Sequence, residues 1–367
     1  MQRGPARLGI VGAGGIAGGR HLPAVRDLGE RVEVVAVVDV DAERARTFAE
    51  TWNIPRHYTA IEAMLDAESL DLAVVCTPPG AHRPAVAACL RAGVHVWCEK
   101  PPTLTLAEYD ELMALEGDGG PYVSYVFQHR FGSGAARLRE QLATGALGRP
   151  LVAACHTMWY RGHGYFDPPW RGRWDTEGGG PTMGHGIHQF DLALHILGDW
   201  AEVRAMMGTL DRDIETEDVS MAAVRLESGA MMSVVNSLLS PRETSYLRFD
   251  FTDATVELNH LYGYDDSSWV WTPASHVDER VSAAWAPRPN ASVASSHTAQ
   301  LRALLDAMDA GARPPSSGTD GRRSLELVAG LYASALTGQP VLRTDLTPVN
   351  PFYHAMNGRP VAAEMTA

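Results

Sequence analysis

One lysine and two histidines stand where they could exchange a proton with a substrate hydroxyl. Lys100 follows the apolar run Val94–Cys98, so we expect it at the carboxyl end of a parallel strand, where α/β proteins bind ligands. An ammonium group there could polarise a substrate oxygen and exchange a proton with an alcohol once it is desolvated. His185 and His188 are three residues apart, which places them on one face of a helix. Because imidazoles titrate near neutrality, this pair could supply a general acid and a general base.

A glycine-rich turn near the start of the chain has the pattern of a dinucleotide-binding site. The run Leu8–Val11 leads into the segment 12–17, Gly-Ala-Gly-Gly-Ile-Ala, which opens a predicted helix. Its first glycine would allow the tight turn, its second would let the backbone approach a pyrophosphate, and the helix N-terminus would face the anion. The next strand ends at Asp39, whose carboxylate can bind the ribose hydroxyls and repel a 2′-phosphate. We therefore predict NAD, held by Gly12, Gly14, Gly15, Ile16 and Asp39.

Alternating strands and helices must position these residues in the first part of the chain. Continuous Val, Ile and Leu runs are typical of parallel strands that are covered on both faces. The predicted strands are Leu8–Val11, Val32–Asp39, Leu72–Cys76, Val94–Cys98 and Tyr122–Tyr125. The predicted helices are Gly15–Leu28, Ala42–Trp52, Ala60–Asp66, Arg83–Ala92 and Thr105–Glu116. This order predicts a Rossmann domain over residues 1–125, built on a doubly wound parallel sheet.

The character of the sequence changes after about residue 127. Longer alternating runs and hairpin-like turns predict a mostly antiparallel, open-faced sheet in an α+β domain over residues 126–367. Helices at 131–144, 186–197 and 295–311 would cover one face of that sheet. The other face could pair with a second subunit, giving a homodimer or homotetramer. The segments 161–181 and 263–295 are rich in Gly, Pro, Asp and Trp and are predicted to be long loops.

Composition narrows the class of protein. The 367 residues are 45% hydrophobic and 20% charged, as in an ordinary globular protein, and the formal net charge of −13 argues against a nucleic-acid partner. No run approaches the ~20 apolar residues of a membrane span, and Met1–Arg7 lack the apolar core of a signal peptide. The four cysteines have no metal-binding spacing, so we expect buried thiols. These features predict a reduced, cytoplasmic protein without a membrane partner.

Several motifs together resemble the Gfo/Idh/MocA oxidoreductase family. They are Thr77–His82 (Thr-Pro-Pro-Gly-Ala-His), Glu99-Lys-Pro101, Tyr125–Arg130, Trp170-Arg171, the triple glycine 178–180 and Asp320–Glu326. The resemblance covers nearly the whole chain. It implies that Lys100 is the catalytic lysine, that His188 is the catalytic histidine, and that the substrate is a sugar, cyclitol or glycoside. It further implies cofactor contacts from Thr77, Pro78, His82, Glu99, Lys100, Trp170 and Arg171, with Gln128 and Arg130 as weaker candidates, and a cis bond before Pro101.

The sequence departs from the family at the start of the histidine helix. The family commonly has Asp-x-Gly-x-His there, whereas this chain reads Gly184-His-Gly-Ile-His188, so the aspartate is replaced by glycine. His185 is either the replacement polar group or a hydrogen-bonded structural histidine. Asp191 is expected to fix the helix rather than to join the proton relay. A zinc site from His185, His188 and His195 has helical spacing but lacks a further ligand, so no metal is predicted.

Aromatic and basic residues are concentrated between 156 and 174. Aromatic rings suit the C–H faces of pyranoses, and arginines suit hydroxyls or an anionic group such as a uronate, sulfonate or phosphate. The same residue types are enriched in subunit interfaces. The predicted substrate-binding residues are Lys100, Tyr160, Arg161, His163, Arg173, Trp174, His185 and His188.

Three functions fit these features. The first is NAD-dependent hydride transfer at a secondary hydroxyl of a sugar or cyclitol, with Lys100 and His188 moving the proton. The second is NAD-dependent glycoside hydrolysis by transient oxidation, elimination, water addition and re-reduction, for which the added His185 could serve as acid or base. The third, which is not enzymatic, is a regulatory protein that senses NAD or a sugar. Retention of both Lys100 and His188 argues against a sensor.

Overall fold

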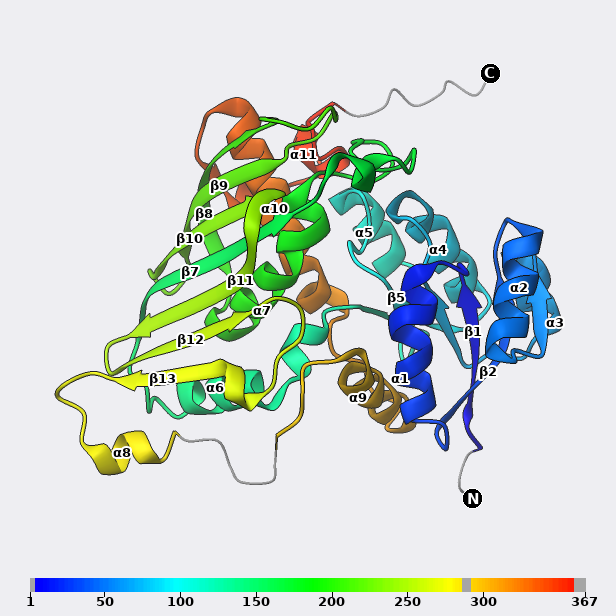
Figure 1. Ribbon diagram of the computed structural model, residues 1–367, viewed down its shortest axis with the longest axis horizontal. Coiled ribbons are helices and arrows are strands. Elements are labelled where there is room, and N and C mark those ends of the chain that lie inside the picture. Colours follow the sequence, from blue (N-terminus) through cyan, green and yellow to red (C-terminus); the bar gives the residue numbers. More distant parts are fainter. Residues whose placement is uncertain (1–3, 286–291, 360–367) are drawn as a thin grey trace. The chain divides into compact units, whose positions relative to one another are not determined.

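The computed structural model describes residues 4–285 and 292–359, which form two compact units (Figure 1). Described residues within Met1–Thr103, Glu108–Val126 and His297–Arg322 form unit 1. Those within Leu104–Ala107, Phe127–Ser296 and Arg323–Ala367 form unit 2. Each unit is therefore built from more than one segment of the chain. The segment His297–Arg322, which the sequence analysis assigned to the second domain, packs in unit 1.

Unit 1 is built on a parallel sheet, as predicted, but it has six strands, because the short strand Arg56–Tyr58 was not among the five that the sequence analysis predicted. The strand order is β3-β2-β1-β4-β5-β6, and all five neighbouring pairs run parallel. The strands are β1 Ala6–Val11, β2 Val32–Val38, β3 Arg56–Tyr58, β4 Leu72–Val75, β5 His95–Cys98 and β6 Val123–Tyr125. All four residues of β4 are buried, which is why this strand reads as an unbroken apolar run. Because the strands are parallel, Asp39, Cys76 and Glu99 follow β2, β4 and β5 at the same edge of the sheet.

Helices α1 and α9 contribute to the core on one face of this sheet. The helices of unit 1, with α5 starting in the short unit-2 segment, are α1 Leu22–Asp27, α2 Ala42–Trp52, α3 Ile61–Ala67, α4 His82–Arg91, α5 Leu106–Met113 and α9 His297–Asp309. Leu301, Leu304 and Leu305 of α9 share one buried cluster with Leu22 and Val25 of α1. The 295–311 helix was expected to cover the antiparallel sheet. The helix instead contacts α1 (Figure 1). The prediction was wrong because the periodicity of a sequence predicts the apolar face of a helix but not the element on which that face packs.

The helix predicted as one piece over Gly15–Leu28 has two parts. A π-helical turn, η1, spans Ala17–His21 and precedes α1. In a π-helix the hydrogen bond spans one more residue than in an α-helix, which changes the direction of the side chains and is frequent at functional sites. His21, the last residue of this turn, is fully buried.

Unit 2 contains an eight-stranded sheet in the order β13-β12-β11-β7-β10-β9-β8-β14. Only β7 and β10 pair in parallel, so the predicted mostly antiparallel sheet is confirmed. Its strands are β7 Pro150–Tyr160, β8 Trp200–Gly208, β9 Val219–Leu226, β10 Met231–Ser237, β11 Leu239–Phe251, β12 Ala254–His260, β13 Trp269–Pro273 and β14 Val341–Leu342. The predicted loop 263–295 contains β13 and the short helix α8 Glu279–Ala283; its residues 286–291 lie outside the described part.

The two faces of the unit 2 sheet differ. Helix α7 (Ile187–Leu197) packs against β7 and β11, and ten of its residues are buried. Further helices of the chain are α6 Ser133–Ala143, α10 Gly318–Thr337 and α11 Pro351–His354. The outward-pointing residues of β7, β8, β9 and β10 include four exposed hydrophobic side chains, namely Val152, Met206, Met221 and Met231. Within the described residues, we find no helix with the length and apolar character needed to cross a membrane.

Candidate active site

The glycine turn after β1 is shaped for close backbone approach. Gly12 has φ +99°, and a Cβ there would lie 2.9 Å from the carbonyl carbon of Cys76, so a side chain would not fit. Space is open beside Gly14 and Gly15. Across the turn, the buried Thr77 hydroxyl has no hydrogen-bond partner among the described residues. An open glycine backbone beside an unsatisfied hydroxyl fits the pyrophosphate of a dinucleotide.

Asp39, directly after β2, is held by the same turn. Its carboxylate accepts hydrogen bonds from the Ala13 amide at 2.9 Å and the Asp41 amide at 3.0 Å. Arg44, in the first turn of α2, pairs with both Asp39 and Asp41 at 3.2 Å. The positive charge of Arg44 is therefore opposed by two carboxylates, which fits a ribose with free hydroxyls better than a 2′-phosphate.

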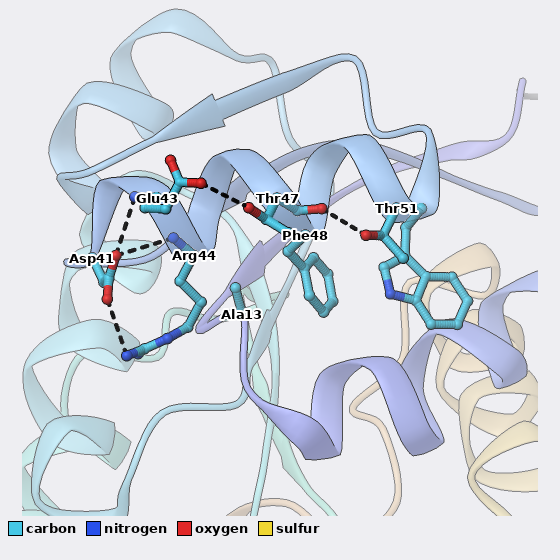
Figure 2. A pocket seen from close by; sticks show the side chains of 8 residues that line it. Ala13, Asp41, Glu43, Arg44, Thr47, Phe48 and Thr51 are labelled. Atoms are coloured by element: carbon cyan, nitrogen blue, oxygen red, sulfur yellow. Dashed lines mark hydrogen bonds and ion pairs between the residues drawn. The ribbon is translucent and has the colours of Figure 1, made fainter.

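A hollow of about 450 Å³ lies beside Asp39 along α2 (Figure 2). Its lining combines Ala13 of the glycine turn with side chains from successive turns of the helix: Asp41, Glu43, Arg44, Thr47, Phe48, Thr51 and Trp52. Asp41 caps α2 by accepting the amides of Glu43 and Arg44. Figure 2 shows the Arg44 side chain reaching back to Asp41 near Ala13, with the Phe48 ring farther along the helix. The hollow thus has a polar end and an aromatic end.

Lys100 comes directly after β5 and Glu99. The Lys100–Pro101 bond is cis, as the family resemblance implied. The Pro101 carbonyl lies 2.8 Å from His82 Nδ1, and the Thr77 carbonyl lies 2.9 Å from His82 Nε2. Burial lowers the pKa of His82, against the opposing effect of these two carbonyls. Both ring nitrogens of His82 are thus engaged by the backbone, and the residue ties the turn after β4 to the turn that carries Lys100.

Two histidines hold the Glu99 carboxylate. His21 Nε2 lies 2.8 Å and His297 Nε2 lies 3.6 Å from Glu99 Oε1, and the Lys100 amide donates to Oε2 at 3.2 Å. Burial opposes ionisation, but contact with His21 and His297 outweighs it and holds the pKa of Glu99 well below its usual range. The lysine is thus preceded by a buried carboxylate fixed from η1 and α9. The sequence analysis predicted Glu99 but neither histidine.

The same three side chains are the one group among residues 4–285 and 292–359 with ligand atoms close enough to share a metal ion. Their ligand atoms lie within 4.8 Å of one another. At 2.8 Å, the His21–Glu99 contact is a hydrogen bond. The zinc alternative from His185, His188 and His195 gains no support, because His195 Nε2 contacts the Arg139 guanidinium at 3.1 Å.

In unit 2 the triple glycine positions the turn before the histidine helix. Buried Glu217 accepts the Gly180 amide at 3.0 Å, the Thr182 amide at 3.1 Å and the Tyr332 hydroxyl at 2.9 Å. A Cβ on Gly180 would lie 1.8 Å from the Glu217 carbonyl oxygen, so only glycine fits. The chain then forms the π-helical turn η5 (Thr182–Gly186) and α7, which carry His185 and His188.

His188 is packed among aromatic rings. Its ring centre lies 5.2 Å from that of His129 and 6.4 Å from those of Phe127 and Tyr262. His129 in turn lies 5.1 Å from His260. Burial lowers the pKa of His260 to about 4, so this ring is neutral at pH 7. His129 was within a quoted motif but was not selected as a site residue, and His260 has no signal in the sequence.

Asp191, one turn after His188, anchors the helix. Its carboxylate accepts the Arg130 Nε–H at 2.7 Å and binds a second guanidinium nitrogen, and Ser324 donates at 3.2 Å. Both Arg130 and Asp191 are buried. This contact agrees with the interpretation of Asp191 as a residue that fixes the helix. It also gives Arg130 a structural partner.

His185 lies beside Trp159 and Tyr165. Its ring centre is 5.2 Å from that of Trp159, and its Nε2 is 3.5 Å from the Tyr165 hydroxyl. A Cβ added to Gly184 would lie 3.9 Å from Glu177 Oε1. A carboxylate, that of Glu177 in the preceding loop, therefore lies near position 184. Glu177 also accepts the Gly172 amide at 2.6 Å.

The other predicted residues of unit 2 fall into two groups. Arg161, Trp170 and Arg171 join the surroundings of Tyr165 or of one another through cation–π contacts, and Gln128 donates to the Tyr262 hydroxyl at 3.1 Å. The side chains of the second group contact other residues. Tyr160 lies under Arg212, His163 is 3.9 Å from Asp211, Arg173 pairs with Asp175 and Glu215, and Trp174 packs on Tyr332.

Several known proteins with similar sequences are named as sugar dehydrogenases. D-Glucoside 3-dehydrogenase of Escherichia coli is 26% identical over 366 residues, covering 93% of this chain and 98% of that protein. D-Apiose dehydrogenase of Paraburkholderia graminis is 28% identical over 340 residues, covering 88% and 85%. The WlbA dehydrogenase of Bordetella pertussis, solved with NADH and UDP-GlcNAcA, is 25% identical with a TM-score of 0.81, covering 92% and 98%.

Two family models match consecutive parts of the chain. Residues 6–126 match the oxidoreductase family with an NAD-binding Rossmann fold, and residues 135–257 match the GFO/IDH/MocA C-terminal domain. The first range includes the glycine turn, Asp39 and Lys100, and the second includes His185 and His188. The chain is therefore an NAD-binding oxidoreductase of the GFO/IDH/MocA family.

Proposed function

We propose that this protein oxidises or reduces a secondary alcohol of a sugar, cyclitol or sugar derivative by NAD-dependent hydride transfer. The observation that carries the proposal is a glycine turn after β1 that fits a dinucleotide, in the same parallel sheet whose β5 is followed by Glu99 and Lys100. The names of the related enzymes, which act on glucosides and apiose, support this class of substrate.

The proton chemistry is assigned to Lys100 and His188. NAD, when bound, supplies the hydride acceptor. Lys100 Nζ donates a hydrogen bond to the substrate oxygen, and a ring nitrogen of His188 takes up the hydroxyl proton. The neutral state of His260 keeps a positive charge away from the aromatic rings around His188, which favours proton uptake there. Glu99, His21 and His297 fix the backbone before Lys100.

The geometry of unit 1 supports several of the proposed cofactor contacts. We place the pyrophosphate at Gly12 and Gly14, with the Thr77 hydroxyl as a further donor. The adenosine ribose is assigned to Asp39 and the adenine to the hollow along α2. His82 acts through the backbone of Pro101. Gly15, Ile16, Pro78, Gln128, Trp170 and Arg171 remain proposed cofactor contacts.

The proposed substrate contacts other than Lys100 lie in unit 2. Arg161 and His185 have the strongest support, because they share contacts with Trp159 and Tyr165. Tyr160, His163, Arg173 and Trp174 remain proposed contacts with weaker support. His163 and Arg173 are exposed, and each pairs with surface carboxylates.

We further propose a homodimer or homotetramer formed through the outer face of the unit 2 sheet, in a reduced, cytoplasmic protein. The four exposed hydrophobic side chains on neighbouring strands support the interface. Four cysteines that are free and buried support the reduced compartment.

The test of function is an assay of purified protein with NAD and a panel of sugars, cyclitols and aryl glycosides. NADH absorbance and released aglycone are recorded together. NADH formed in proportion to oxidised sugar supports a dehydrogenase. Aglycone released over many turnovers without net NADH would instead support the redox-neutral hydrolase. Binding of NAD without turnover of any compound would contradict both and support a sensor.

A further inference from the structure

Around His185, two arginines and two aromatic rings form a guanidinium–aromatic cluster, defined as Trp159, Arg161, Tyr165 and Arg171. The Arg161 guanidinium lies 4.8 Å from the Trp159 ring centre and 5.4 Å from that of Tyr165. The Arg171 guanidinium lies 3.9 Å from the Tyr165 ring centre and donates to the Tyr165 hydroxyl. His185 contacts both Trp159 and Tyr165. The cluster also reaches the surroundings of His188, because the Tyr262 ring lies 6.3 Å from Trp159 and 6.4 Å from His188.

Each arginine of the cluster is already matched by a carboxylate. Arg161 pairs with Glu243 at 2.8 Å, and Glu243 also accepts the Tyr160 amide at 2.8 Å. Arg171 pairs with Glu177 at 3.2 Å, and Glu177 also accepts the Gly172 amide. The backbone amides fix both carboxylates in place. Together with these two carboxylates, the two arginines of the cluster carry no formal net charge.

Partial burial strengthens the electrostatic interaction between each arginine and its carboxylate. Side-chain exposure is 24% for Arg161 and 30% for Glu243, and it is 21% for Arg171 and 9% for Glu177. Charges that are partly removed from water are screened less than surface charges. An anionic group that approached either guanidinium would therefore also be repelled by the carboxylate that is paired with it. Hydroxyl groups can accept from the remaining guanidinium N–H groups or donate to a carboxylate, and they carry no charge to be repelled.

We propose that this cluster binds an uncharged, hydroxyl-rich ring and discriminates against sugars with a carboxylate or phosphate. This inference rests on the proposed function, because it assumes that the cluster near His188 receives the substrate. The sequence alone does not distinguish a neutral sugar from a uronate, because the arginines at 161, 171 and 173 could bind either. The matched charges favour a neutral sugar or cyclitol.

The experiment compares matched pairs of substrates with the full-length enzyme at saturating NAD. Methyl glycosides of glucose, galactose and mannose are each paired with the corresponding methyl uronide, and myo-inositol is paired with an inositol monophosphate. We expect kcat/KM for the neutral member to exceed that for the anionic member by at least about tenfold in every pair with turnover. Equal or higher kcat/KM for the anionic members would overturn the inference while leaving the dehydrogenase function intact. Absence of NADH with every compound would overturn the proposed function, and the inference with it.

Charge variants test the cause of the preference. Glu243→Gln leaves Arg161 unmatched, so the neutral-to-anionic ratio should fall by about tenfold or more, chiefly through KM for the anionic substrate. Glu177→Gln should act in the same direction through Arg171 and serves as a second variant if the first one does not fold. The matched control is Glu140→Gln, which removes the same charge from the Arg137–Glu140 pair of α6. An unchanged ratio in folded Glu243→Gln and Glu177→Gln proteins would overturn the proposal.

Discussion

At the scale of single residues, Lys100 and His188 share one proposed proton transfer. We expect Lys100→Met and His188→Asn each to lower kcat by roughly 10²- to 10⁴-fold, because each removes a group that acts on the reacting hydroxyl. The double variant should fall by no more than about tenfold further, since residues that act as a unit are not additive. Steady-state NADH formation provides the measurement.

The control for this prediction is on the same helix. His195→Asn removes an imidazole that contacts Arg139, so kcat should stay within about twofold of the parent value. Fully multiplicative effects of Lys100→Met and His188→Asn would contradict a shared step. A loss in His195→Asn as large as that in His188→Asn would point to a helix defect instead.

His260 links stability to pH. Its pKa is about 4 in the folded protein, against an ordinary histidine value of 6.5 in the unfolded chain, so between these values the unfolded chain binds more protons. This contribution to the free energy of unfolding is complete above pH 6.5 and falls by about 3 kcal/mol as the pH drops to 4. Urea unfolding at pH 7 and pH 4.5 should show a smaller pH-dependent loss for His260→Gln than for the parent. Exposed His276→Gln should keep the parental dependence, and equal slopes in all three proteins would refute the assignment.

Sequence motifs predict some site residues because those residues act through local chain geometry. Asp39 follows β2, the strand after the glycine turn, and Lys100 follows β5 by two residues, so both positions can be deduced from a short stretch of sequence. Other site residues have partners that are distant in the sequence. His297 reaches Glu99 across 198 residue positions, and Glu243 reaches Arg161 across 82. Contacts of that kind depend on tertiary packing, which no local pattern records.

At the scale of elements, apolar runs predicted the parallel strands well. Buried strands such as β4 give unbroken apolar segments, and a strand ends where polar residues begin. The division of the first helix into η1 and α1 was not predictable in this way, because π and α turns have similar apolar spacing. The strand β13 was predicted to be part of a loop, since only five residues pair, at the edge of the sheet.

The turn before α7 offers a test at this scale. Gly180→Ala should destabilise unit 2 by more than about 2 kcal/mol and lower activity, because its Cβ would collide with the Glu217 carbonyl oxygen at 1.8 Å. Gly184→Ala, whose Cβ would meet nothing closer than 3.9 Å, should change stability by about 1 kcal/mol or less. Thermal unfolding of the two variants measures the difference. Equal melting temperatures would show that the turn does not constrain the helix.

At the scale of the whole molecule, the chain order does not follow the compact units. Helix α9 belongs to unit 1 although it follows most of the unit 2 residues in the sequence. His297 at its first position contacts the carboxylate of Glu99, beside Lys100. A single boundary near residue 125 was the simplest interpretation of a change in pattern along the sequence. The sequence pattern does not show that a helix late in the chain packs in the first unit, because an amphipathic helix can pack on either sheet.

The exposed sheet face predicts assembly. Val152 is the register partner of Met231, and Met206 is the register partner of Met221, so the four side chains form two pairs on the same face of the sheet. Met221→Glu combined with Met231→Glu should shift the protein toward the monomer, because it buries charge in an apolar interface. Light scattering after size-exclusion chromatography gives the mass. Val349→Glu, on a loop residue that is 93% exposed, is the control. An unchanged oligomer in the double variant would place the interface elsewhere.

The central claim, hydride transfer from a sugar carbon to NAD, is tested most directly with a perdeuterated neutral sugar that the enzyme turns over. Mass spectrometry of the reduced cofactor reports the origin of its hydride. The account predicts one deuterium in the nicotinamide of each NADH formed, and loss of this product in Lys100→Met and His188→Asn. Reduced cofactor without deuterium, or sugar conversion with no reduced cofactor at any time, would contradict it.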